Sequence, residues 1–348
     1  MSVDAFIRAM PKVELNARLE GAFRKEILMS IADGNEIAAE VKRFNELVNA
    51  FDEPDCSKLA EHVRTYMEWV RHPDDLSRLV YDAGVALARQ NVKYVEMSIN
   101  LGLHMLSGMS FEDFISAIND GRSRVERGWG IRIAWILTVM RDEPRLADDT
   151  IRWAASTSGR KQGIIGFGLL GSEVTQPAGQ FERAFATAAK KEVPSVVQAG
   201  DSKGAEGIRD ALTLLPNRLI DGWGVLEEPD LLEQLSNLEM PLVVNMTRAV
   251  CMNWITAHNE YPLRELYDAN IKVVLGSSMP NVYGATLSDE YATAVNACGL
   301  SVDELKEIAL NAVDASYLPD DEKAALRTSF EQAYAALEDE HLSPSETV

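Results

Sequence analysis

The sequence is poor in cysteine and contains no long apolar run. Its only cysteines are Cys56, Cys251 and Cys298, and no two of them form a Cys-x-x-Cys pair. Widely spaced cysteines in an odd number are typical of free thiols in a reducing compartment, so we expect all three to be unpaired. No segment approaches the roughly 20 consecutive apolar residues of a membrane-spanning helix. The N-terminal stretch MSVDAFIRAMPKVEL lacks the apolar core of a signal peptide, which predicts a cytoplasmic protein.

Positive charge is also scarce. The chain has 34 Lys and Arg residues against 54 Asp and Glu residues, which gives a formal net charge of −20. A surface of that sign repels the phosphates of nucleic acid and the head groups of anionic lipid, so we expect neither nucleic acid nor a membrane as a partner. We expect a small-molecule ligand instead, and a homodimer is compatible with the sequence.

The sequence does contain a regular alternation of short apolar runs and helical patterns. Eight runs have nearly continuous apolar interiors, as expected for strands that are buried on both faces of a parallel sheet. They cover residues 12–15, 92–99, 131–139, 163–170, 194–198, 218–221, 241–245 and 271–276. Eight strands separated by helices predict an α/β fold, the (β/α)8 TIM barrel with additional helices.

No linker or internal repeat interrupts this alternation. We therefore expect a single barrel domain over residues 1–348. The helical patterns over about 22–91 and about 301–340 are extra helices, and the polar residues from about 341 to 348 are expected to be frayed.

In such a barrel the active site forms at the carboxyl ends of the strands. Several segments at these ends resemble motifs of the adenosine deaminase family. MPKVELNARLEG is similar to Pro-Lys-Val-Glu-Leu-His-x-His-Leu-Glu-Gly, YVEMSI to Tyr-x-Glu-Val-Arg, and VVQAGD to Val-His-Ala-Gly-Glu. GFGLLGSE resembles Gly-x-Asp-Leu-x-Gly-Asp-Glu, and PLRELYDANIKVVLGSSMP and TLSDEY resemble the last strand and the helix after it. The resemblance implies a barrel of the adenosine-deaminase type, within the amidohydrolase superfamily.

The resemblance fails at the residues that carry the family's chemistry. The family's zinc ligands are two histidines on the first strand, one on the fifth and an aspartate on the eighth, and they correspond to Asn16, Arg18, Gln198 and Ser278. The proton-transferring glutamate after the fifth strand corresponds to Asp201. The histidine of the sixth strand corresponds to Trp223 when GWG is matched to Gly-His-Gly, which requires extra residues before it. The second aspartate of the eighth strand corresponds to Met279, whereas the substrate-binding glycine and the next glutamate are retained as Gly171 and Glu173.

These replacements argue against a zinc site. Zinc binds imidazole, thiolate or carboxylate groups, and the amides of Asn16 and Gln198 are poor ligands for it. The fixed positive charge of Arg18 would repel a cation. Without zinc, no hydroxide is available at neutral pH to attack a purine. We therefore expect no metal, no other cofactor and no deamination of adenosine by the zinc mechanism.

Apart from simple decay of the site, two interpretations of the new residues are open. In one, Arg18 pairs with Asp201 and the amides complete a purely structural network. In the other, the cluster binds a small polar ligand, with Arg18 and Asp201 as catalytic residues. Arg18 would then stabilise an anionic group or a developing oxyanion, and Asp201 would carry a proton. The expected substrate-binding residues are Asn16, Gly171, Glu173, Gln198, Trp223 (as a stacking surface), Arg248, Ser278 and Met279.

Three functions are consistent with this pattern. The first is a metal-independent enzyme acting on a small polar or ring-containing metabolite through a pocket centred on Arg18 and Asp201. The second is a non-catalytic pseudoenzyme that binds a nucleoside-like or anionic ligand, or a protein partner. The third is residual deaminase activity on a purine-like substrate. An open pocket with an unpaired Asp201 would favour the first, and an Arg18–Asp201 pair sealed under Trp223 would favour the second.

Overall fold

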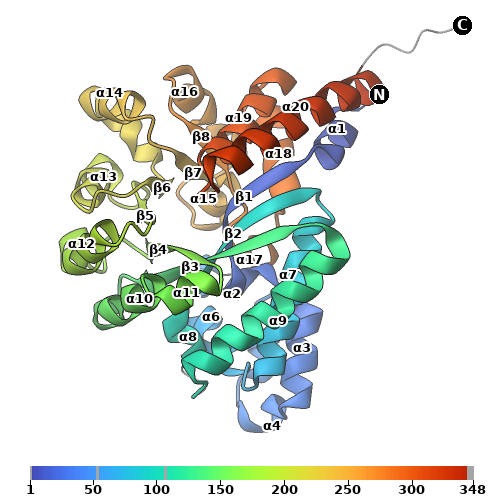
Figure 1. The fold of residues 1–348 in the computed structure, drawn as a ribbon, viewed down its shortest axis with the longest axis vertical. Helices are drawn as coiled ribbons and strands as arrows, with labels where there is room; N and C mark the ends of the chain where they lie inside the picture. The colour runs from blue at the N-terminus through green and yellow to red at the C-terminus, as the bar shows by residue number, and fades with distance from the viewer. Residues whose placement is uncertain (1, 52–54, 106–107, 343–348) are drawn as a thin grey trace, which may run out of the picture.

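The computed structural model describes residues 2–51, 55–105 and 108–342. Its centre is one sheet of eight parallel strands that follow one another in sequence order (Figure 1). Each strand overlaps one of the eight predicted runs, so the predicted (β/α)8 barrel is confirmed. The strands are β1 (Lys12–Arg18), β2 (Val92–Asn100), β3 (Arg132–Met140), β4 (Ile164–Leu170), β5 (Ser195–Ala199), β6 (Arg218–Asp221), β7 (Leu242–Val244) and β8 (Val273–Leu275).

Helices surround this sheet, and several of them lie between β1 and β2, as the length of that segment predicts (Figure 1). They are α2 (Leu19–Ala22), α3 (Lys25–Gly34), α4 (Ile37–Glu40), α5 (Phe44–Asn49), the 3-10 helix η1 (Cys56–Lys58), α6 (Leu59–Glu68) and α7 (Pro73–Ala88). The remaining α-helices are α1 (Val3–Ala9), α8 (Leu101–Met105), α9 (Phe111–Trp129), α10 (Ala147–Ala154), α11 (Thr157–Lys161), α12 (Glu182–Lys190), α13 (Gly204–Leu212), α14 (Pro229–Asn237), α15 (Met246–Cys251), α16 (Leu263–Asp268), α17 (Pro280–Tyr283), α18 (Leu287–Asn296), α19 (Val302–Asp314) and α20 (Asp320–His341).

Local sequence signals fix several helix boundaries. At the start of α9, the Ser110 hydroxyl accepts a hydrogen bond from the backbone N–H of Asp113 at 3.1 Å. Gly130, with a φ of 64°, ends the same helix in the left-handed conformation that favours glycine. Ser301 and Glu304 form a capping box at the start of α19. These short-range bonds are readable in the sequence because they involve residues three positions apart.

The N-terminal and C-terminal helices pack together at the amino end of the barrel. Helix α1 lies beside α20 (Figure 1), and the Tyr334 hydroxyl donates to the carbonyl of Pro11 at 3.0 Å, directly before β1. The expected frayed tail lies outside the described residues from 343 onward. No helix of the described ranges has both the length and the apolar character that crossing a bilayer requires.

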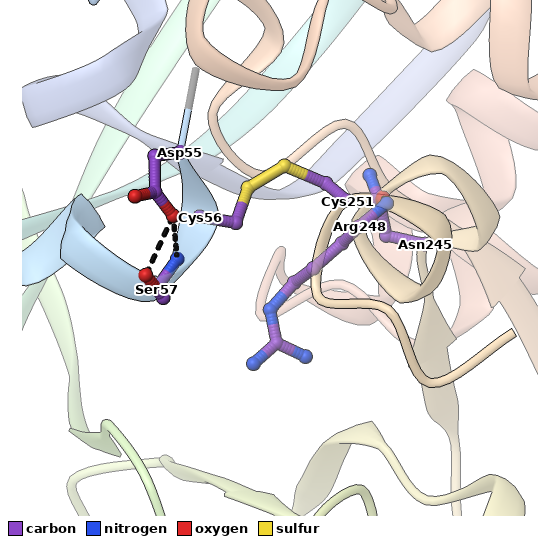
Figure 2. Close-up of a disulfide and its surroundings, with 6 residues drawn as sticks. All are labelled: Asp55, Cys56, Ser57, Asn245, Arg248 and Cys251. Atoms are coloured by element: carbon purple, nitrogen blue, oxygen red, sulfur yellow. Dashed lines mark hydrogen bonds between the residues drawn. A yellow bond between two sulfur atoms is a disulfide. The ribbon is translucent and has the colours of Figure 1, made fainter.

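The prediction of three free cysteines is wrong for two of them. Cys56, in η1, and Cys251, at the end of α15, form a disulfide whose Cα atoms lie 5.9 Å apart (Figure 2). That separation is ordinary for a disulfide. The two residues are 195 positions apart in the sequence, so their spacing gave no sign of the pairing. Cys298 is a free thiol.

Candidate functional site

A cavity of about 300 Å³ opens at the carboxyl ends of the strands. Five consecutive strands contribute polar groups to its lining: Arg18, Asn100, Thr138, Gly171 and Gln198 lie in or directly after β1, β2, β3, β4 and β5. Helix α6 and the region of α15 form outer walls. The apolar part of the lining includes Leu59, Val63, Leu103, Met140, Leu170, Met252, Trp254 and Met279. A mostly apolar cavity with a few converging polar groups is typical of a small-molecule site.

Arg18, at the end of β1, is held by Gln198 of β5. Its Nη2 donates to Gln198 Oε1 at 2.9 Å, and Gln198 Nε2 donates to Asp201 Oδ2 at 3.0 Å. The Arg18 side chain is buried, yet it forms no ion pair with any residue that the structure describes. Its Nε also has no hydrogen-bond partner among them. A direct Arg18–Asp201 pair, which the structural interpretation requires, does not form, because Gln198 lies between the two.

Asp201 pairs with Arg248 instead. Arg248 donates from Nη2 to Asp201 Oδ2 at 3.0 Å and from Nη1 to Asp221 Oδ2 at 2.7 Å. Although burial acts to raise the pKa of Asp201, the charge of Arg248 and several hydrogen bonds hold that pKa below its usual range. Asp201 is therefore ionised at neutral pH and poorly suited to carry a proton.

Asp221 is a buried carboxyl that the sequence analysis missed. It is the last residue of β6, and burial raises its pKa to about 7 against the opposing charge of Arg248. Its position at the end of the RLID run was the available signal.

Trp223 does not lie in the predicted position. It starts the 3-10 helix η4 (Trp223–Glu227) and does not line the 300 Å³ cavity. Its ring stacks on that of Tyr261, with centroids 5.6 Å apart and planes inclined by 17°. Because β6 ends two residues before the tryptophan, the half-buried Trp223 lines a neighbouring cavity of about 340 Å³, together with Asp201, and not the 300 Å³ cavity.

Glu173 and Gly171 support the loop that carries Asp201. The Glu173 carboxylate accepts the backbone N–H of Gly200 at 2.9 Å and those of Asp201 and the next two residues at 3.1 to 3.2 Å. Gly171 has a φ of 100° and donates its N–H to Gln198 Oε1 at 3.1 Å. Gly171 lines the cavity, whereas Glu173 acts behind it by fixing the loop after β5.

The remaining predicted positions divide into two groups. Asn16 and Ser278 are buried but do not line the cavity, and in the described ranges neither Asn16 Oδ1 nor Ser278 Oγ has a hydrogen-bond partner. The carbonyl of Ser278 accepts the backbone N–H of Arg18 at 2.8 Å. Met279 does line the cavity, and a Cβ on Gly21 would lie only 2.3 Å from the Met279 Cβ, so this contact requires glycine.

The fold brings Arg18 of β1, Gln198 of β5 and Ser278, which follows β8, together at the carboxyl ends of the strands. Arg18 contacts Gln198 through its side chain and Ser278 through its backbone. Within the described part of the chain, no group of three or more His, Cys, Asp or Glu side chains is arranged to hold a metal ion. Thr138, at the end of the third apolar run, lines the cavity and was not predicted.

Comparison with known proteins agrees with this architecture. The chain is 29% identical to an aminodeoxyfutalosine deaminase of Streptomyces avermitilis, over 95% of this chain and 93% of the relative. It is 27% identical to an adenine deaminase of Acinetobacter baylyi, over 93% and 97%. A solved amidohydrolase of Burkholderia ambifaria with bound Zn has the same fold, with a TM-score of 0.89 at 23% identity over 98% of this chain and 95% of that one. Residues 11–333 match the family model of adenosine deaminase, and the chain therefore belongs to the adenosine deaminase family.

Proposed function

We propose that this member of the adenosine deaminase family binds a small polar metabolite in its barrel cavity without a zinc ion. The observation that carries the proposal is the hydrogen bond from Arg18 to Gln198 at 2.9 Å, at two positions where the family has zinc-binding histidines. Guanidinium and amide groups are not zinc donors, and a buried guanidinium repels a divalent cation. The residues present therefore do not fit zinc, and we derive no reaction step through a metal.

The state of Asp201 favours binding over acid–base catalysis. Its carboxylate accepts hydrogen bonds from Arg248 and from Gln198, each at 3.0 Å. Although burial acts to raise its pKa, the charge of Arg248 and these bonds hold the pKa below its usual range. An ionised carboxylate in an ion pair is a weak proton acceptor. The two curated relatives named above are deaminases of adenine and of aminodeoxyfutalosine, which makes a ring-containing metabolite the expected ligand class.

A metal-independent reaction on the bound metabolite is the second candidate. The observation that favours it is Arg18, a buried cation that lines the cavity and forms no ion pair with the described residues. Such a group can stabilise negative charge that develops in a transition state. Turnover of a bound metabolite, measured by mass spectrometry of the ligand before and after incubation, would separate this candidate from simple binding.

Metal analysis tests the proposal. The purified chain and the Burkholderia ambifaria protein, as a positive control, are dialysed against dilute zinc and then measured by inductively coupled plasma mass spectrometry. We expect the control to retain zinc and this chain to retain far less than one equivalent. The matched variant combines Asn16→His, Arg18→His, Gln198→His and Ser278→Asp, and we expect it to gain zinc. Stoichiometric zinc in the unmodified chain, lost on substitution of Gln198, would overturn the proposal.

A further inference from the structure

We infer that the cavity contains an oxyanion subsite formed by Arg18, Asn100 and Thr138, and that its ligand carries a carboxylate or phosphate group. This inference rests on the proposed function and names the chemical class of its ligand. The three residues lie at the ends of three neighbouring strands, β1, β2 and β3, and all of them line the same cavity.

Each residue of the subsite presents a buried polar atom without a partner. Arg18, Asn100 and Thr138 are 8%, 4% and 1% exposed. Arg18 Nε, Asn100 Nδ2 and Thr138 Oγ1 make no hydrogen bond to any described residue. Buried polar groups in folded proteins are nearly always paired, so three unpaired ones on one wall indicate that a ligand supplies the partners.

The surrounding bonds fix these groups as donors. Asn100 Oδ1 accepts the backbone N–H of Gly102 at 2.9 Å, so the amide nitrogen is the atom that is left free. Gln198 holds Nη2 of Arg18 and thereby fixes the orientation of the guanidinium. The hydroxyl of Thr138 can rotate to donate. Three unpartnered donors on neighbouring strands of one cavity select a group rich in acceptors, as a carboxylate or phosphate is.

The three arginines of the cavity lining differ in their pairing, although the lining also carries the acidic residues Glu20, Asp142, Glu143 and Asp201. Arg64 pairs with Glu143 at 2.7 Å, Arg248 pairs with Asp201 at 3.0 Å, and the Glu20 carboxylate contacts the His104 ring at 3.1 Å. Arg18 is the arginine of the described lining that forms no ion pair, although the charges of Asp221 and Glu20 act on it from a distance. Desolvated cations need a counter-charge, and an oxyanion supplies it.

One acceptor nearby limits where the anion can lie. Glu143 Oε2 has no hydrogen-bond partner in the described structure, although Oε1 accepts from Arg64. A carboxylate repels an anion, so the charged end of the ligand belongs at Arg18 and an N–H or O–H of the ligand fits Glu143. The apolar residues Leu103, Met140 and Leu170 line the same cavity and suit a ring.

Three ring compounds of similar size test the subsite: benzoate, phenyl phosphate and the neutral benzamide. Binding is measured by isothermal titration calorimetry at constant ionic strength. We expect at least one anion to bind about 10-fold or more tighter than benzamide, because hydrogen bonds to charged groups are stronger than neutral ones. Comparison of the two anions shows whether the subsite takes carboxylate or phosphate.

The variants locate the effect. We expect Arg18→Gln to abolish the preference for anions, and Asn100→Ala and Thr138→Val to reduce it about threefold or more each. Arg264→Gln is the matched control, since it removes the same charge from an arginine that is paired with Glu304 and does not line the cavity. Benzamide binding as tight as the anions, or no binding of any of the three, would overturn the subsite. Zinc in the protein is the separate result that would overturn the proposed function.

A second inference rests on a different observation, the disulfide. We propose that the Cys56–Cys251 disulfide is a redox-sensitive cross-link between the two outer walls of the cavity. Cys56 lines the cavity and starts η1, which leads directly into α6, and Val63 and Arg64 of α6 line the cavity as well. Cys251 ends α15, the helix that carries Arg248 (Figure 2).

The cross-link therefore joins α6 to the helix whose arginine holds Asp201 and Asp221. The Arg248 guanidinium also lies 4.6 Å from the ring centroid of Trp254, another lining residue. With the disulfide formed, the two walls cannot separate at this point. With the disulfide reduced, the described contacts include no other covalent link between them, and we expect a bound ligand to leave more readily.

A dithiol can reduce this bond by thiol–disulfide exchange. One thiolate of the dithiol attacks one sulfur of the pair, which forms a mixed disulfide and releases the other cysteine as a thiolate that takes up a proton. The second thiol of the dithiol then attacks the mixed disulfide and releases the remaining cysteine thiol. The protein gains two electrons and two protons, and the dithiol becomes a cyclic disulfide.

Dissociation kinetics of a bound anion test this cross-link. The fluorescence of the unmodified protein is followed after rapid dilution of its complex with phenyl phosphate or benzoate, whichever binds tighter, with and without dithiothreitol. We expect reduction to raise the dissociation rate about fivefold or more, and Cys56→Ser and Cys251→Ser to show the fast rate without reductant. Cys298→Ser, which removes the free thiol, should behave like the unmodified protein. Equal rates in the oxidised and reduced forms would refute the proposal, as would mass spectrometry that finds both cysteines reduced after treatment with oxidised glutathione.

Discussion

Arg248 lies between two buried carboxylates, Asp201 and Asp221, and this arrangement gives the two acids different behaviour. Both accept hydrogen bonds from the same guanidinium. Asp201 also accepts a hydrogen bond from Gln198. Burial acts to raise its pKa, but the charge of Arg248 and the hydrogen bonds lower it further than burial raises it. For Asp221 burial has the larger effect, and its pKa is raised to about 7. Asp221 therefore changes charge near neutral pH, and its charge is felt at Arg18.

This titration predicts a pH dependence of anion binding. Below pH 7 Asp221 is protonated and neutral, and above it the new negative charge weakens the attraction of Arg18 for an anion. We expect the dissociation constant of benzoate, whose own charge is constant over this range, to rise about fivefold or more between pH 6 and pH 8. Calorimetry at both pH values measures this change. Asp221→Asn should remove the dependence, and an unchanged dependence in that variant would assign it to another group.

At the scale of elements, the short helix α15 connects the stability of the fold to the site. Asn245 Oδ1 caps it by accepting the backbone N–H of Arg248 at 2.5 Å, and Asn245 Nδ2 donates to the Gly276 carbonyl at 2.7 Å. The Glu290 carboxylate accepts the N–H groups of Met246 and Thr247 at 2.9 and 3.2 Å. Six residues of helix are thus anchored at their start by two side chains from the rest of the barrel.

Loss of this cap should affect both stability and binding. We expect Asn245→Ala to lower the free energy of unfolding by about 1–2 kcal/mol, in the range measured for N-cap residues, and to weaken benzoate binding because the helix start positions Arg248. Asn245→Ser retains a capping oxygen and should restore part of both losses. Urea denaturation and calorimetry measure the two effects.

The matched control is Ser301→Ala, which removes the N-cap of α19, on a helix that contributes no residue to the cavity lining. It should lose similar stability without losing affinity for benzoate. A parallel loss of affinity in the control would mean that binding follows global stability, and the specific role of α15 would then be wrong.

At the scale of the whole molecule, the disulfide ties the region between β1 and β2 to the region after β7. A cross-link between such distant residues restricts the unfolded chain strongly, and native disulfides typically contribute about 2–5 kcal/mol. We expect Cys56→Ser to lower the free energy of unfolding by about that amount without reductant, as measured by urea denaturation. Cys298→Ser should change it by less than about 1 kcal/mol. Equal stability of Cys56→Ser and the oxidised protein would contradict this expectation.

Much of the fold was predictable from the sequence because parallel strands are buried on both faces. The apolar runs over 92–99 and 131–139 match Val92–Asn100 and Arg132–Met140 closely, since continuous apolar character is a local property. The site was predictable only in outline. Arg18 and Gln198 were predicted to lie together in the cavity, and they form a hydrogen bond there. Asp221 and Thr138 were not predicted. Trp223 was predicted to line the cavity, and it does not.

The sequence by itself determined the barrel, the strand ends at which a site can form, and the residue types that stand at those ends, among them Arg18, Gln198 and Asp201. Each of these depends on local apolar periodicity or on the identity of single residues. Only the tertiary structure decided that Asp201 pairs with Arg248 rather than Arg18, that Cys56 bonds to Cys251, and that Arg18, Asn100 and Thr138 share one wall. These pairings join residues that are far apart in the chain. They depend on distances that the eight-stranded sheet and its surrounding helices set, and sequence spacing carries no information about them.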